Sequence, residues 1–146
     1  MQNPPKPLHK YTKLSDYINA LPTVMDRDET NNAITELLNR AASEKDDPVE
    51  MAEALVEMVL HLSDSYSSLE TPLEMRLLAW IKSHWRTEPL DIVGMMCTML
   101  AGIQSAEAEA FLEEKLKEEK GSPAGEILQS IITSRSESLE RRRKRD

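Results

Sequence analysis

The chain has 146 residues and a formal net charge of −8, and its length suits one domain with a single buried core. Its one cysteine excludes an internal disulfide and a cysteine metal cluster, and its apolar runs are too short to span a bilayer. Because an acidic surface repels phosphates and attracts cations, this composition disfavours nucleic acid and favours a basic protein as the partner of the body of the chain.

Helix-forming residues dominate the composition, and short helical patterns follow one another along the chain. Residues 1–13 contain Pro and Lys and predict an extended arm. We then predict helices over residues 16–21, 27–43, 48–67, 72–85, 89–103 and 106–120, and from residue 123 into a basic C-terminal tail, residues 140–146. No segment alternates apolar and polar residues as a strand does, so we expect an all-α fold of six to seven short helices, without a sheet, in one domain over residues 14–139.

Prolines and capping residues mark the predicted helix starts. Proline suits the first helical turn because its missing N–H would have no intrahelical partner there. Side-chain oxygens just before the helix accept an orphan backbone N–H, and a Glu three residues later closes a capping box. The proline starts are Asp47-Pro48, Thr71-Pro72, Glu88-Pro89 and Ser122-Pro123, and the other predicted caps are Ser15, Asp26 and Ser105. Gly121 is a predicted stop signal.

A weak period lies in the second half of the chain. The predicted helix starts at residues 72, 89, 106 and 123 are 17 residues apart, so that Leu77 aligns with Phe111. Two such units make an α-hairpin, and hairpins that stack on their neighbours are typical of HEAT-like repeats. The alternative is an irregular helical bundle whose helices have similar lengths.

The clearest candidate site is an acidic stripe on the helix predicted for residues 48–67. Its members are three or four positions apart, so they share one helix face, and no Lys or Arg lies in that helix. Like charges at this spacing cost about 0.2–0.5 kcal/mol per pair, which suits a face reserved for a cationic partner. The alternative is a solvated face that only keeps the protein soluble. The acidic stripe consists of Glu50, Glu53, Glu57, His61 and Asp64, and Asp46 and Asp47 extend it.

The sequence lacks the patterns of a metal or catalytic site. A zinc hydrolase would use His-Glu-x-x-His, and a di-iron bundle would repeat Glu-x-x-His on several helices. Neither pattern is present, and no nucleophile elbow or glycine-rich phosphate loop is found. We therefore expect no metal, no cofactor and no catalysis.

Three further features have ordinary structural interpretations. Cys97 has Met and Leu neighbours and is expected to be a buried small hydrophobe, with a reactive thiol as the alternative. His84 is expected to bond the last carbonyls of its helix. The tail, residues 141–145, is expected to be solvated, with nucleic acid, anionic lipid or an import receptor as alternative contacts.

A group of residues in the second half of the chain carries a resemblance to a known family. These residues are Trp85, Asp91, Ile92, Val93, Leu100, Ser105, Ala106, Glu107, Ala108, Phe111 and Leu112. With them, residues 72–139 resemble the helical-repeat immunity proteins of bacterial toxin systems. The resemblance implies a small cytoplasmic protein that binds a cognate toxin, often a basic nuclease, and blocks its active site or its substrate approach. The basic tail departs from what that family leads us to expect.

These features together predict a non-catalytic protein-binding module. We expect an immunity or antitoxin protein whose acidic stripe mimics phosphate charges and neutralises a basic toxin. The alternatives are an adaptor subunit that binds through an apolar groove between helices and an accessory factor that uses the basic tail. Residues 1–7 lack the apolar stretch of a signal peptide, so we expect a cytoplasmic location. The oligomeric state stays open.

Overall fold

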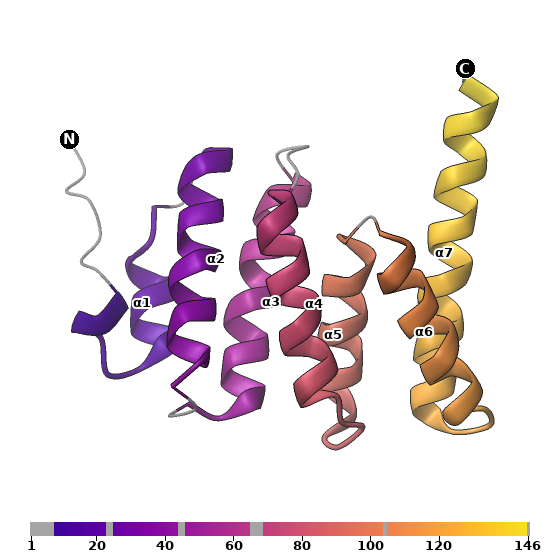
Figure 1. The fold of residues 1–146 in the computed structure, drawn as a ribbon, viewed down its shortest axis with the longest axis horizontal. Helices are drawn as coiled ribbons and strands as arrows, with labels where there is room; N and C mark the ends of the chain where they lie inside the picture. The colour runs from indigo at the N-terminus through magenta and orange to yellow at the C-terminus, as the bar shows by residue number, and fades with distance from the viewer. Residues whose placement is uncertain (1–7, 23–24, 44–45, 65–68, 104, 146) are drawn as a thin grey trace. The chain divides into compact units, whose positions relative to one another are not determined.

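A computed structural model describes residues 8–22, 25–43, 46–64, 69–103 and 105–145, without the side chains of residues 9, 63, 64 and 135–145 (Figure 1). The described residues form seven α-helices and one short 3-10 helix and contain no strand, which confirms the predicted all-α fold. The elements are η1 (Leu8–Lys10), α1 (Leu14–Ala20), α2 (Arg27–Ala41), α3 (Pro48–Asp64), α4 (Thr71–His84), α5 (Leu90–Ala101), α6 (Ala106–Glu118) and α7 (Pro123–Arg145).

The helices group into two compact units. The domain predicted from the sequence, residues 14–139, includes helices of both units. The first unit is Met1–His84 with η1 and α1 to α4, and the second unit is Trp85–Asp146 with α5 to α7. Each unit has its own buried side chains.

In the first unit, the main contacts join helices that are two apart in sequence and the neighbouring pair α2 and α3. Helix α2 packs against α3, while α1 pairs with α3 and α2 pairs with α4. This pattern places α1 and α3 in one layer and α2 and α4 in the other, as in stacked α-hairpins. The side chains between the layers include Ile34, Leu37, Leu55, Leu77 and Ile81, all of which are fully buried.

In the second unit, α5 and α6 both pack against α7, and α5 also contacts α6. Apolar side chains at helical spacing, Ile92, Met96 and Leu100, are fully buried on α5. Phe111 of α6 is buried as well, and its ring meets that of Trp85 edge to face at a centroid distance of 5.5 Å. The burial of this apolar surface stabilises the packing of the three helices in the second unit.

Three predicted caps are confirmed. Asp26 and Glu29 form the reciprocal capping box of α2, and the Ser105 hydroxyl accepts the Ala108 N–H at 3.1 Å. At the start of α7, the Ser122 hydroxyl accepts the Gly125 N–H at 3.1 Å. Gly121 adopts a φ of 87° in the turn before α7, a left-handed conformation that glycine adopts without a Cβ clash.

Three helix starts differ from the prediction. Helix α1 begins at Leu14, because the burial of Leu14 outweighs the cap expected from Ser15, which lies inside the helix. Helix α4 begins at Thr71, so Thr71 is a helical residue and does not serve as the N-cap. Helix α5 begins at Leu90 with Pro89 at the N-cap position. The observed starts therefore follow the predicted 17-residue period only approximately.

The two ends of the chain also differ from expectation where the structure describes them. Residues 8–10 were predicted to be part of an extended arm, but they form η1, which packs against α2 and buries Leu8. The first seven residues of that arm lie outside the described part. Helix α7 continues through Arg145, so the backbone of residues 140–145, which were predicted to be a basic tail outside the domain, is helical.

Candidate protein-binding site

The acidic stripe lies on the outer face of α3. Glu50, Glu53 and Glu57 are exposed, whereas Leu55 and Met58 of the same helix are almost completely buried. A helix turns by about 100° per residue, so the spacings of three and four keep the carboxylates together and away from the core. The structure thus brings these three predicted residues onto one surface.

The three carboxylates are not in ion-pair contact with any cationic side chain that the structure describes. Within the described part of the chain, no Lys or Arg pairs with Glu50, Glu53 or Glu57. Asp47 is exposed just before the first turn of α3, while His61 is half-buried and engaged in a further interaction. The side chain of Asp64 lies outside the described residues.

Asp46 differs from the rest of the predicted set because its charge is already compensated. Arg40 of α2 donates from Nε to Oδ2 at 2.7 Å and from Nη2 to Oδ1 at 2.8 Å. The Asp46 side chain is only 10% exposed. The turn from α2 into α3 brings the carboxylate against the guanidinium, a tertiary contact that sequence spacing does not reveal. Asp46 therefore holds the first unit together, and we no longer count it in the acidic stripe.

An apolar strip runs beside the stripe on α3. Leu60 is 45% exposed, and Val49 and Val56 are half-buried. Their spacings of seven and four place them on the flank of α3 next to Glu53. This apolar strip was not predicted from the sequence, although the spacing of Val49, Val56 and Leu60 follows the period of a helix. The outer face of α3 thus offers negative charge together with apolar area, as protein interfaces do.

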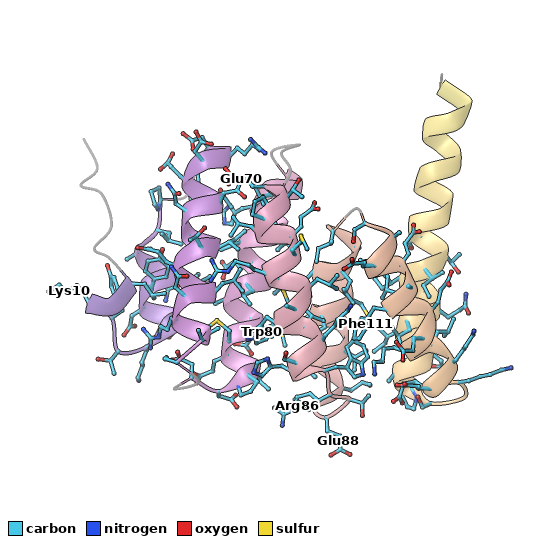
Figure 2. All side chains as sticks on the ribbon, in the orientation of Figure 1. Lys10, Glu70, Trp80, Arg86, Glu88 and Phe111 are labelled. Carbon is cyan, nitrogen blue, oxygen red and sulfur yellow. The ribbon has the colours of Figure 1, made fainter. Side chains whose placement is uncertain are left out.

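A pocket of about 280 Å³ opens where α2 ends, α3 begins and α4 ends. His84 Nδ1 lies 2.9 Å from the Trp80 carbonyl oxygen, and because a carbonyl only accepts, Nδ1 donates. This bond ties His84 to its own helix, but the Trp80 carbonyl lies one turn before the end of α4, so the bond differs from the predicted cap of the last carbonyls. The ring of His84 also stacks on that of Trp80 at a centroid distance of 4.8 Å (Trp80 is labelled in Figure 2). The pocket is lined by Ala41, Asp46, Pro48, Met51, Trp80 and His84.

The second unit has an apolar groove between the first turn of α5 and α7. Leu90 is 43% exposed, and Ile127 and Ile131 are half-buried. The groove encloses about 350 Å³, and Pro123, Glu126 and Ser130 complete its lining. Such a surface suits an apolar side chain or helix of a partner.

Cys97 is inert rather than reactive. It is fully buried in α5, and this burial raises the pKa of its thiol to about 12, so the thiolate is scarce at neutral pH. The predicted role as a small hydrophobe is confirmed. In the described residues, no group of three or more His, Cys, Asp or Glu side chains is arranged to hold a metal ion. None of the described helices combines the length and hydropathy that crossing a bilayer requires.

Comparisons of this chain with protein families, with curated proteins and with solved structures found no match. The likeness to toxin-immunity proteins therefore stays an expectation from the sequence. The surfaces that can bind a partner are the outer face of α3, the neighbouring pocket and the groove of the second unit.

Proposed function

We propose that this chain is a non-catalytic protein-binding module that neutralises a basic toxin, such as a nuclease, through the acidic stripe on α3. The observation that carries the proposal is the exposure of Glu50, Glu53 and Glu57 on one helix face without a cationic partner among the described residues. A cation-rich partner would remove the repulsion that the free helix tolerates.

The spacing of the stripe supports mimicry of nucleic acid. Residues 50–57 cover about 10 Å of helix axis, so three negative charges lie about 5 Å apart along it. A nucleic-acid strand carries one charge per about 3.4 Å of axis, which is of the same order. Lys and Arg side chains arranged for phosphates would therefore find carboxylates within reach.

The apolar strip beside the stripe supports a stable complex rather than a loose encounter. Charges at an interface mainly steer association and select the partner, whereas burial of apolar area supplies much of the affinity. Leu60 is exposed by 45% beside Glu53 and Glu57, so it would become buried under a partner seated on the stripe.

The test begins with affinity capture of the partner from the native cell, followed by binding measurements on charge-reversed variants. We expect the double variant Glu53→Lys/Glu57→Lys to bind roughly tenfold more weakly and to associate more slowly, with a larger effect at low salt. The matched control is Glu109→Lys/Glu113→Lys on α6, which changes the net charge equally at the same spacing of four residues. Equal losses in both variants, or no loss in the stripe variant, would refute the proposal.

An inhibitor must also block the activity of its captured partner. We expect the wild-type chain to suppress cleavage of nucleic acid by a captured nuclease at a one-to-one ratio, and the stripe variant to need a large excess. A captured partner without a basic surface would contradict the proposed mechanism.

The groove of the second unit supports a second candidate, an adaptor that binds an apolar segment of another protein. Leu90 is its most exposed large apolar side chain. If the adaptor function is correct, Leu90→Asp will abolish capture of the partner while the reversal of Glu53 and Glu57 leaves it intact. The opposite pattern supports the acidic stripe.

A further inference from the structure

We propose that the pocket of the first unit receives an arginine side chain of the basic partner. This inference rests on the proposed function, because the pocket and the acidic stripe share the first turn of α3. Pro48 and Met51 of that turn line the pocket, and the exposed Asp47 and Glu50 are their neighbours in sequence.

The size of the pocket suits one long side chain. Its volume is about 280 Å³, at the lower end of the roughly 300–1,000 Å³ found for ligand pockets. Single anchoring side chains, with Arg among the commonest, often fill pockets at the centre of protein interfaces. The pocket can therefore hold one long side chain of a partner.

The lining matches the two parts of an arginine side chain. Ala41, Pro48 and Met51 provide apolar contact for its methylene stem, as buried stems of long charged side chains require. The half-buried ring of His84, which stacks on the buried ring of Trp80, provides aromatic surface for the planar guanidinium, and a guanidinium stacks on such rings better than the compact ammonium of lysine does.

The polar groups of the lining provide acceptors for the guanidinium. Arg40 donates one hydrogen bond to each oxygen of Asp46, and a carboxylate has about four acceptor sites, so further sites stay open. In the neutral ring of His84, donation from Nδ1 makes Nε2 an acceptor. Because Arg40 offsets the charge of Asp46, the net attraction comes from the exposed Asp47 and Glu50. Among the described residues that line the pocket, there is no Lys or Arg.

The two tryptophans allow a direct test with short peptides. The probe is Ac-Gly-Arg-Gly-NH2, and its matched control replaces arginine by citrulline, which has nearly the same shape and no charge. Binding is followed through the indole N–H signals in a proton–nitrogen correlation spectrum of the full chain, assigned with Trp85→Phe. Trp80 lines the pocket and Trp85 does not, so the Trp85 signal is an internal reference.

We expect the arginine peptide to shift the Trp80 signal with roughly millimolar affinity and the citrulline peptide to bind at least about threefold more weakly. Ala41→Leu should abolish the shift because it fills the pocket, whereas Ala42→Leu, the exposed neighbour outside the lining, should not. An unmoved Trp80 signal, equal binding of both peptides, or full binding by folded Ala41→Leu would overturn the inference. Circular dichroism and thermal unfolding establish that both variants are folded.

The captured partner separates failure of the pocket from failure of the proposed function. If Ala41→Leu binds the partner like wild type while Glu53→Lys/Glu57→Lys does not, the pocket inference fails and the proposed function stands. If Ala41→Leu weakens binding and the double reversal does not, the pocket stands and the acidic stripe fails. Weakening by both variants, with Ala42→Leu unaffected, supports both.

Discussion

Arg40 and Asp46 form a two-point ion pair that joins the end of α2 to the turn before α3. Two further N–H groups of the same guanidinium, on Nη1 and Nη2, donate to the carbonyl oxygens of Tyr11 and Thr12, each at 2.7 Å. The hydrogen bonds that Arg40 donates to Asp46 raise the pKa of Arg40, so the guanidinium stays charged. One side chain therefore fixes the N-terminal segment, α2 and the start of α3 to one another.

This arrangement gives Arg40 a structural role in the first unit. We expect Arg40→Ala to lower the free energy of unfolding by about 2–3 kcal/mol, because Asp46 and two carbonyls lose their donors. Arg40→Lys should recover less than half of this loss, since an ammonium lacks the planar fork. Urea unfolding followed by circular dichroism measures both values, and wild-type stability in Arg40→Ala would contradict the structural role.

The side chain of Asn31 in α2 accepts a hydrogen bond from the backbone just before α4. Its side chain is 2% exposed, accepts the Glu70 N–H at 3.1 Å and donates to the Arg27 carbonyl at 2.8 Å. We expect Asn31→Ala to cost about 1–3 kcal/mol, because a buried N–H loses its acceptor. Asn32→Ala, at the exposed neighbouring position, should change stability by less than about 0.5 kcal/mol in the same unfolding assay.

Tyr17 of α1 donates to Glu36 of α2 at 2.6 Å, and burial together with this bond raises the pKa of the phenol above its usual 10.0. The protonated phenol is therefore favoured in the folded state. Its stabilising contribution is fully present below pH 10 and is lost as the pH rises further. Tyr17→Phe should lower stability by about 1–2 kcal/mol at neutral pH. It should also flatten the alkaline decline seen in unfolding curves above pH 10, and identical declines in both proteins would argue against the raised pKa.

Burial should protect Cys97 from thiol reagents. Its pKa of about 12 and its complete burial leave almost no accessible thiolate in the folded chain. We expect labelling by an aromatic disulfide reagent at pH 8 to be slower than that of the urea-unfolded chain by roughly a hundredfold or more. Rapid labelling of the folded chain would show that α5 opens readily.

The acidic stripe should reduce stability in the absence of a partner. Glu53→Lys replaces two repulsive pairs, with Glu50 and Glu57, by two attractive ones at helical spacing. We expect it to raise the free energy of unfolding by about 0.5–1 kcal/mol at low salt and by less at high salt. A stabilised variant with weaker partner binding would show that stability and function compete on this face. A destabilised Glu53→Lys would mean that Glu53 makes a favourable contact within the fold.

The helical fold class and most of the helix starts could be predicted from the amino-acid sequence. Local rules suffice there, because a cap such as Asp26 with Glu29 or Ser105 with Ala108 involves residues within one turn. The exposure of Glu50, Glu53 and Glu57 also followed from spacing alone, since residues three and four apart share a helix face.

Which polar side chains are paired inside the fold depends on contacts between helices. Asp46 pairs with Arg40, and Asn31 binds the Glu70 N–H, across distances in sequence that no local rule covers. The same holds for η1 and for the start of α1, where burial of Leu8 and Leu14 outweighs local propensity. The physical reason is that apolar burial and buried hydrogen bonds depend on which helices meet, and this is set by packing rather than by neighbours in the chain.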